Sequence, residues 1–317
     1  MKPFNQALLK ALQDICPGNV RANVSMAEIS SWRVGGSVAA FVTPSSLQQL
    51  IEVRKFVSTQ QIPSLIIGNT TNLLFTDDYI SAVIIQIGSL FSEVRVDGEK
   101  ITAQAGLWVP MLARKAMHSG LTGLEHTCGI PGTLGGLVVM NGGSQRKGVG
   151  EHITHIITVD KLGLIKRYKR DECKFSYRSS VFQKLDEVIV EVGLKLLPAG
   201  DKRAVHAEML SMLRERSNKF PRKQPNCGSV FVSDPKMYEW YGAPGEVIER
   251  CGLKGVKKGQ AQVSLVHANF ILNNGGASSE DIMFLINLIR GRVFEETGYS
   301  MRVEPKFVTR QGVVEDI

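Results

Sequence analysis

The sequence lacks several short patterns that mark common classes of protein. Its five cysteines, at positions 16, 128, 173, 227 and 251, include no CxxC pair. Neither a zinc site nor a disulfide framework is therefore expected. No GxGxxG follows a predicted strand, which argues against a Rossmann nucleotide site, and no GxxxxGK[ST] is present, which argues against an NTPase.

Long apolar runs are missing as well. No run approaches the roughly 20 residues that span a bilayer. Residues 1–18 follow the pattern of an amphipathic helix ended by Pro17 and Gly18, without the apolar region of a signal peptide. We therefore expect a cytoplasmic protein with no membrane partner. His152 and His155 lie three apart in a predicted strand, which directs their rings to opposite faces, so no metal site is expected there.

The composition is that of a soluble globular protein. The 317 residues, 43% hydrophobic and 21% charged, are enough for two domains or one large one. The net charge of +8 would suit nucleic acid or small anionic ligands. Lys and Arg are spread along the chain without interleaved aromatic residues, and are densest at 214–223 and 254–258. This pattern favours small anions or a solvated surface over nucleic acid.

Hydrophobic periodicity predicts a mixed chain of helices and strands. A capping box of Ser46 and Gln49 starts a helix that continues to about residue 58, and Ser278 with Asp281 starts a long helix near the end. Further helices are expected at Val109–Met117 and Arg203–Arg216. Strands are expected at Ser64–Ile67, Ala82–Ile87, Ile101–Ala105, Ile153–Val159 and Val188–Leu196.

The most unusual segment runs from Gly129 to Gly143 and reads GIPGTLGGLVVMNGG. Glycine is costly to order, so this density indicates tight turns or a close approach of backbone to another group. Outward-facing amides in such turns bind anions. The run Leu137–Met140 would be a buried strand or a short helix that fixes both loops. The segment is either a cradle for a cofactor pyrophosphate or a tight connection beside a buried strand, and glycine density alone favours the latter.

Several motifs occur in one order along the chain. They are SWRVGG at 31–36, GNTTNLL at 68–74, the glycine stretch, CKFSYRSSVF at 173–182, QPNCGSVFVSDP at 224–235, GLKG at 252–255, AQVSLVHANF at 261–270 and VEP at 303–305. This series resembles the UDP-N-acetylenolpyruvoylglucosamine reductase (MurB) family of flavoenzymes from about residue 20 to residue 309. GIPGTLGG, YRSSVF and GSVF in this order are specific, whereas each alone is weak.

The resemblance implies an α+β fold. An N-terminal helix and lead-in (1–30) would precede an FAD-binding domain of the p-cresol methylhydroxylase/vanillyl-alcohol oxidase type (31–197) and a C-terminal α+β substrate domain (201–313). In the family, NADPH reduces FAD, which then reduces the enolpyruvyl UDP-sugar to UDP-N-acetylmuramate for peptidoglycan synthesis, and hence for cell shape and division. The implied partners are FAD, NADPH and the UDP-sugar, and the implied state is a monomer.

The resemblance also implies the site residues. Arg178 would polarise the substrate carboxylate, since its planar fork suits carboxylates, and Ser229 would donate the proton that follows hydride addition. The implied FAD contacts are Arg33, Val34, Gly68, Asn69, Thr70, Thr71, Asn72, Gly129, Ile130, Pro131, Gly132, Thr133, Gly135, Gly136, Asn141 and Gly142. The implied substrate contacts are Tyr177, Lys254, Gln262, His267 and Asn269.

One departure from the family concerns its ending pattern LEPEVR, whose second glutamate assists protonation. Aligning Glu304 and Pro305 on the first EP places Lys306 on that glutamate. Lys306 would then favour a developing enolate and lower the pKa of Ser229, or over-bind the ground state and slow turnover. Glu304 is expected two residues away on the same strand face, about 6.5–7 Å from Lys306.

A second departure lies in the first flavin loop, where the family has GGGSN and this chain has GNTTN at 68–72. Thr70 is expected to resist a positive φ and to obstruct a pyrophosphate, whereas Asn69 tolerates left-handed geometry better. Flavin binding weaker than in typical members is expected. Three hypotheses remain: a working reductase, a relative that reduces another unsaturated nucleotide-sugar, and a degenerate nucleotide-sugar-binding protein without turnover.

Overall fold

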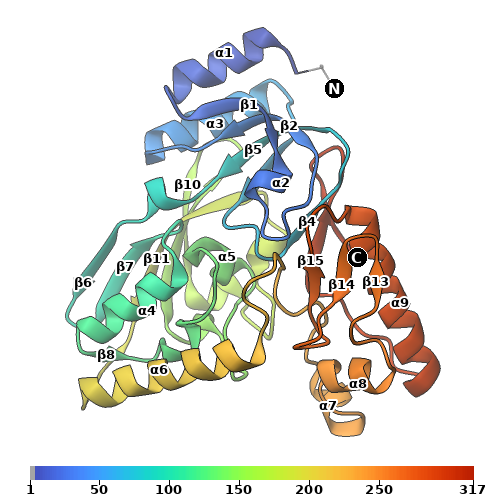
Figure 1. Cartoon of the computed structure of the whole chain (residues 1–317). Helices are drawn as coiled ribbons and strands as arrows, with labels where there is room; N and C mark the ends of the chain where they lie inside the picture. Colours follow the sequence, from blue (N-terminus) through green and yellow to red (C-terminus); the bar gives the residue numbers. More distant parts are fainter. Residues whose placement is uncertain (1–3) are drawn as a thin grey trace. The chain divides into compact units, whose positions relative to one another are not determined.

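The structure is a computed structural model that describes residues 4–317. The chain forms two compact units (Figure 1), the first from residues up to Ala22, Ala40–Asn69 and Val83–Arg216, the second from Asn23–Ala39, Thr70–Ala82 and Ser217–Ile317. Both units are discontinuous, whereas the predicted domains 31–197 and 201–313 are continuous, and those domain limits stay predictions. Residues 1–3 of the predicted 1–30 segment lie outside the described residues.

The first unit is built around an antiparallel sheet with strand order β10-β9-β11-β7-β6. β11 is buried along most of its length, as its run of β-branched residues predicts. The elements of this unit are α1 (Gln6–Ile15), α3 (Leu47–Thr59), β3 (Ser64–Ile67), β6 (Val94–Asp97), β7 (Lys100–Gln104), α4 (Val109–His118), β8 (Leu121–Thr122), α5 (Leu134–Val139), β9 (Ile153–Asp160), β10 (Ile165–Lys169), β11 (Glu187–Lys195) and β12 (Leu197–Pro198).

Five short 3-10 turns complete the described part of this unit. They are η1 (Ser89–Phe91), η2 (Glu125–Thr127), η3 (Val149–Glu151), η4 (Arg170–Cys173) and η5 (Val181–Gln183). The chain passes from one unit to the other within four elements, namely β1 (Val20–Ser25), β2 (Ser37–Val42), β5 (Ile80–Gln86) and α6 (Lys202–Lys219).

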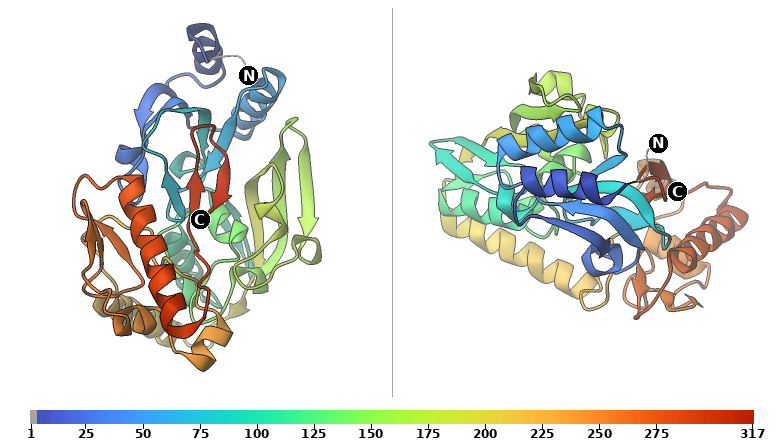
Figure 2. Two further views of the ribbon diagram at one scale, coloured as in Figure 1. Left: turned by 90° about the vertical axis from the view of Figure 1, so that its right-hand side faces the viewer. Right: turned by 90° about the horizontal axis from the view of Figure 1, so that it is seen from above.

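The second unit contains a long helix and two small sheets, of order β13-β14-β15 and β17-β16-β4. Figures 1 and 2 show helix α9 alongside β13 and β14, which it contacts. The elements are α2 (Met26–Ile29), β4 (Leu73–Phe75), α7 (Pro235–Trp240), α8 (Pro244–Arg250), β13 (Lys257–Lys258), β14 (Ala261–Val263), β15 (Ile271–Asn273), α9 (Ser279–Thr297), β16 (Lys306–Val308) and β17 (Val314–Asp316).

Local capping signals fix the helix starts that the sequence predicted. The Ser46 side chain accepts a hydrogen bond from the Gln49 amide at 3.2 Å, and α3 follows. Ser278 and Asp281 form the reciprocal capping box of α9, which ends at Gly298 with φ 70°. The predicted helices and the five predicted strands are present, with ends that differ by up to three residues, except that the N-terminal helix predicted within residues 1–18 begins at Gln6.

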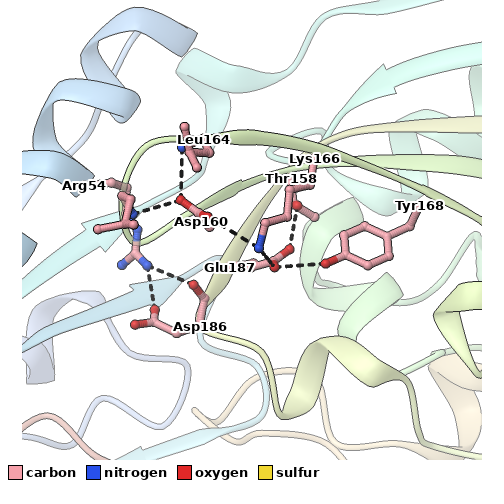
Figure 3. Close-up of polar contacts among 9 residues, drawn as sticks. Arg54, Thr158, Asp160, Leu164, Lys166, Tyr168, Asp186 and Glu187 are labelled. Carbon is pink, nitrogen blue, oxygen red and sulfur yellow. Dashed lines mark hydrogen bonds and ion pairs between the residues drawn. The ribbon is translucent and has the colours of Figure 1, made fainter.

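A partly buried polar cluster joins β9, β10 and the start of β11 (Figure 3). The Glu187 carboxylate accepts hydrogen bonds from Thr158 (2.6 Å), Lys166 (2.7 Å) and Tyr168 (2.9 Å). Burial alone would raise the pKa of Glu187, but these three donors lower it below its ordinary value. The charge of the Glu187 carboxylate is therefore balanced by hydrogen-bond donors of the fold itself, as removal from water requires. We interpret the cluster as structural.

Candidate active site

The glycine stretch lies against the loop that follows β7. Leu134 donates its amide to the Leu107 carbonyl at 2.8 Å, and Gly135 donates to the Ala105 carbonyl at 2.7 Å. The apolar run that was expected to be a strand or a short helix forms α5, and Thr133 caps it by accepting from the Gly136 amide. The first glycine cluster thus runs into the start of α5, and the second follows its end.

The start of the first predicted flavin loop meets the glycine stretch inside the same unit. A Cβ atom at Gly68 would lie 2.2 Å from Thr133 Oγ1, so only glycine allows this approach. The Asn69 amide donates to the Pro131 carbonyl at 3.5 Å, and Gln86 holds the Gly68 carbonyl at 3.2 Å. The structure therefore brings together two of the segments that the sequence assigned to flavin.

The glycines of the stretch fall into two kinds. A Cβ at Gly143 would lie 2.0 Å from the Lys147 carbonyl oxygen, and one at Gly142 would lie 2.6 Å from Leu137 Cδ1. Gly136 is exposed, and its nearest neighbour would be Thr133 Oγ1 at an ordinary 3.5 Å. A helical glycine costs about 1 kcal/mol relative to alanine, and the fold does not require one at Gly136. Backbone left open there suits the close approach of a cofactor.

Arg178 and Tyr177 lie at the far end of the glycine stretch. Arg178 Nη1 donates to the Gly143 carbonyl at 3.2 Å, and the guanidinium lies 5.4 Å from the centre of the Tyr177 ring. Asn141 ties this end together, because its amide accepts from the Gly150 amide at 2.9 Å and donates to the Ser176 carbonyl at 2.8 Å. A predicted catalytic residue, substrate contact and flavin contact thus share one region of the first unit.

The rest of the first flavin loop belongs to the second unit, and Thr70 overturns one expectation there. Thr70 has φ 55°, although a β-branched residue was expected to avoid this region, whereas Asn69 is not among the residues with positive φ. The Thr70 side chain is buried, and its hydroxyl accepts a hydrogen bond from the Ser31 amide at 2.9 Å. Such backbone strain costs about 1–3 kcal/mol and persists only where surrounding contacts over-determine it.

The SWRVGG motif is fixed to the core of the second unit. The Trp32 indole is fully buried and donates to the Ile271 carbonyl at 2.8 Å, while the Asn273 amide donates to the Trp32 carbonyl at 2.9 Å. Arg33 follows with φ 57° and an exposed side chain, and Val34 is buried. The predicted cofactor contact at Arg33 is thus presented at the surface by a rigid turn.

Ser229 is presented by a tight turn. Gly228 has φ 79°, and its amide donates to Asn226 Oδ1 at 2.9 Å. The Cys227 thiol, whose pKa burial raises, donates to the carbonyls of Thr70 and Leu73 at 3.6 Å each. Cys227 therefore links the first flavin loop to the Ser229 segment. No motif signals this contact, because the partners lie more than 150 residues apart.

Glu304 and Lys306 have different surroundings. The Glu304 amide donates to the Val230 carbonyl at 2.8 Å, directly after Ser229 in the chain. Lys306 begins β16, and its ammonium forms an ion pair with Asp316 in β17. A bend at Pro305 separates the two, so the expectation that one strand carries both is wrong. Asn72 contacts both backbones, donating from its side chain to the Glu304 carbonyl and accepting from the Lys306 amide.

The predicted substrate contacts of the second unit are held by neighbouring groups. Asn269 is buried, and its amide makes two hydrogen bonds to the backbone of Phe231, of 2.8 and 2.9 Å. It therefore supports the GSVF segment. Burial and the nearby Lys219 charge lower the pKa of His267, which favours a neutral ring. Gln262 donates to the Gly255 carbonyl, and Lys254 pairs with Glu249 at 2.8 Å.

Comparison with known proteins identifies the family. Residues 38–168 match the family model described as "FAD binding domain", and residues 220–308 match "UDP-N-acetylenolpyruvoylglucosamine reductase, C-terminal domain". UDP-N-acetylenolpyruvoylglucosamine reductase 1 of Corynebacterium glutamicum is 42% identical over 98% of this chain and 92% of its own length. The chain belongs to the UDP-N-acetylenolpyruvoylglucosamine reductase (MurB) family.

Other members of the MurB family are also similar to this chain over most of its length. The reductase of Heliobacterium modesticaldum is 36% identical over 90% of each chain. The crystal structure of the MurB enzyme of Thermus caldophilus superposes with a TM-score of 0.77 and 28% identity, over 91% of this chain and 99% of that one. These matches confirm the predicted α+β fold with an FAD-binding domain, and they make the chain an FAD-dependent oxidoreductase.

Two further observations concern the described residues 4–317. None of their helices has both the length and the apolar character needed to cross a membrane. No group of three or more His, Cys, Asp or Glu side chains is arranged there to hold a metal ion.

Proposed function

We propose that the protein reduces the enolpyruvyl group of UDP-N-acetylglucosamine enolpyruvate to give UDP-N-acetylmuramate, with NADPH as the source of hydride. The observation that carries this proposal is the match over nearly the full length of relatives that bear the reductase name. The exposed Gly136 beside the crowded contact of Gly68 with Thr133 supports it, since this is a cradle that a side chain would fill. The product is a peptidoglycan precursor, and we further propose that the protein makes it in the cytoplasm as a monomer.

Bound FAD supplies the capacity to accept hydride from NADPH and to pass it to the substrate double bond. The residues that would hold it are those of the first loop, Gly68–Asn72, and of the glycine stretch, with Arg33 and Val34. Backbone amides in these tight turns would face the pyrophosphate, as in other anion-binding turns. Arg33 would add a positive charge from its exposed turn.

Arg178 would stabilise the negative charge that develops on the substrate carboxylate. Hydride addition to an enol ether beside a carboxylate moves electron density onto that carboxylate, and a fixed cation at that point lowers the barrier. The Gly143 carbonyl and the Tyr177 ring limit the positions open to the guanidinium. A preorganised group of this kind needs little reorganisation during the reaction.

Ser229 would deliver the proton to the second carbon. A hydroxyl is a weak acid, so it needs neighbours that stabilise its deprotonated form or resupply its proton. The turn at Gly228 and the hydrogen bonds of Asn269 to Phe231 hold the serine segment in place. Loss of the hydroxyl should slow proton transfer and leave the hydride step from NADPH unchanged.

We assign the assisting carboxylate to Glu304 rather than to Lys306. The family pattern LEPEVR can also be aligned with this chain in a second register. In that register Glu304 aligns with the second glutamate of the pattern, and Lys306 aligns with its arginine. The ion pair of Lys306 with Asp316 suits a basic residue of the sheet. The backbone bond of Glu304 to Val230 suits a residue that works beside Ser229. In this second register, the position of the family's assisting glutamate is occupied by an acid in this chain as well.

The two half-reactions test the proposal directly. Purified protein that contains FAD is mixed anaerobically with NADPH, and flavin absorbance is followed before and after addition of the enolpyruvyl UDP-sugar. We expect bleaching by NADPH and recovery on addition of the UDP-sugar, with UDP-N-acetylmuramate as product. Bleaching without recovery would indicate another unsaturated nucleotide-sugar as substrate. A protein that neither contains nor takes up FAD would overturn the assignment as a reductase.

A further inference from the structure

A small basic pocket in the first unit lies beside the predicted site. It has a volume of about 220 Å³, and its lining includes Asn141, Arg146, Lys147, Arg170 and Tyr177. We propose that this pocket binds a phosphate group of one of the two substrates, either the 2′-phosphate of NADPH or the diphosphate of the UDP-sugar. The proposal rests on the function proposed above and adds a recognition site to it.

The charge of the lining favours an anion. Arg146, Lys147 and Arg170 contribute three positive charges to the lining and Glu151 one negative charge, and Asp171, outside the lining, pairs with Arg170 at 3.7 Å. Arg170 is held in place because its Nε donates to the Gly150 carbonyl at 2.9 Å. Arginine forks and lysine ammonium groups are the usual protein partners of phosphate oxygens.

The loop that carries two of these cations is held in an uncommon conformation. Gln145 and Arg146 have φ values of 55° and 63°, a region that non-glycine residues seldom occupy. The loop is tightly packed at both ends, since a Cβ at Gly143 would meet the Lys147 carbonyl oxygen and one at Gly148 would meet Asn141 Oδ1 at 2.6 Å. Strain maintained by such packing is characteristic of ligand-binding segments.

The size and position of the pocket limit what it can hold. Pockets that enclose a whole small molecule measure about 300–1,000 Å³, so about 220 Å³ suits a fragment such as a phosphate with part of a sugar. Asn141 and Tyr177 also belong to the predicted flavin and substrate contacts. The fragment would therefore be part of a ligand that extends toward the reaction site.

The test replaces the loop cations by an uncharged polar side chain. Arg146→Gln, Lys147→Gln and the double variant are compared with Arg167→Gln, which removes an exposed cation of β10 outside this pocket. Calorimetric titration with UDP and with 2′-AMP measures binding of each kind of phosphate without turnover. The kcat/KM values for NADPH and NADH, together with KM for the UDP-sugar, measure the same contacts in the reaction.

We expect the double variant to bind one of the two probes about tenfold or more weakly than the parent does. The affinity of Arg167→Gln for both probes should stay near that of the parent. Weaker 2′-AMP binding with a lower preference for NADPH over NADH would identify the 2′-phosphate. Weaker UDP binding with a raised KM for the UDP-sugar would identify the diphosphate. If the double variant binds both probes as well as the parent does, or if the parent protein binds neither probe, the proposal that this pocket binds phosphate is wrong. A parent that binds a probe but never reduces the UDP-sugar would instead overturn the proposed function.

Discussion

Two adjacent segments near the C-terminus, 303–305 and 306–308, have different partners. The first bonds to the serine segment, with Val303 bridged to Phe231 and Glu304 bonded to Val230. The second forms the middle strand of the β17-β16-β4 sheet, and the charge of Lys306 is balanced by Asp316. Neighbours in sequence are thus held by different parts of the second unit, one by the segment of the proposed proton donor Ser229 and the other by a small sheet.

The same distinction applies to other residues. Gly143 is required by the fold, because a side chain there would meet backbone at 2.0 Å, whereas Gly136 has open space around it. Glu187 has three donors within the fold, whereas Glu304 lies next to the segment of Ser229. We therefore expect substitution of Gly143 or Glu187 to affect stability, and substitution of Gly136 or Glu304 to affect cofactor binding or the reaction.

The largest effect is expected from Ser229→Ala. General acid catalysis contributes about 10²- to 10⁴-fold, so flavin reoxidation by the UDP-sugar should slow by that factor while reduction by NADPH is unchanged. Stopped-flow absorbance separates the two half-reactions. Ser233→Ala, at an exposed position of the same segment, is the control and should keep both rates. Equal losses in both half-reactions would mean that Ser229 is not the proton donor.

The next effect is expected from Gly136→Val. The added side chain meets no crowded atom of the protein but occupies the space left for the cofactor, so FAD affinity should fall about 10- to 100-fold. The melting temperature without flavin should change little. Gly291→Val, at an open and exposed helical glycine of α9, is the matched control and should keep FAD. A Gly136→Val protein with normal flavin content would remove the glycine stretch from the cofactor site.

A smaller effect, on stability alone, is expected from Glu187→Gln. Hydrogen bonds to a charged group contribute about 1.5–3 kcal/mol, so the variant should unfold more easily in urea at pH 7. The lowered pKa means that the folded protein holds the ionised form, so this stability is present above the ordinary glutamate pKa and is lost as pH falls through and below about 4. The difference from the parent should therefore shrink in acid. Glu191→Gln serves as control, and an equal difference at both pH values would contradict the assignment.

The smallest effect is expected from Asp316→Asn. Its carboxyl is 84% exposed, and pairs of this kind contribute about 0–1 kcal/mol. Stability should fall slightly, and both flavin half-reactions should keep their rates. A large loss of flavin reoxidation in this variant would mean that the Lys306 ion pair takes part in the chemistry.

The sequence predicted those parts of the fold that local signals determine. The capping boxes of α3 and α9 involve residues three apart, and the β-branched run of β11 is a property of one segment. The strands β13 to β17 are two or three residues long and were not predicted, because such short segments show no periodicity. Their pairing, such as β16 with β4, joins residues more than 200 positions apart.

The sequence predicted candidate site residues but not the contacts that hold them. The motif order predicted the glycine stretch, Arg178 and Ser229 as parts of the site, and the comparisons confirm the family to which those motifs pointed. The positive φ of Thr70 depends on the distant Ser31 amide, and the surroundings of Lys306 depend on Asp316. Both are long-range contacts that no motif encodes, and each reversed or redirected an expectation.

The most direct test of this account compares Glu304→Gln with Lys306→Gln in the rate of flavin reoxidation by the enolpyruvyl UDP-sugar, measured on the FAD-loaded variants. We predict that loss of the Glu304 charge slows this step about 10²-fold, in the range of general acid–base catalysis, whereas loss of the Lys306 charge leaves it within about threefold of the parent, as for an exposed ion pair. The reverse result, with Lys306→Gln slow and Glu304→Gln normal, would contradict the assignment.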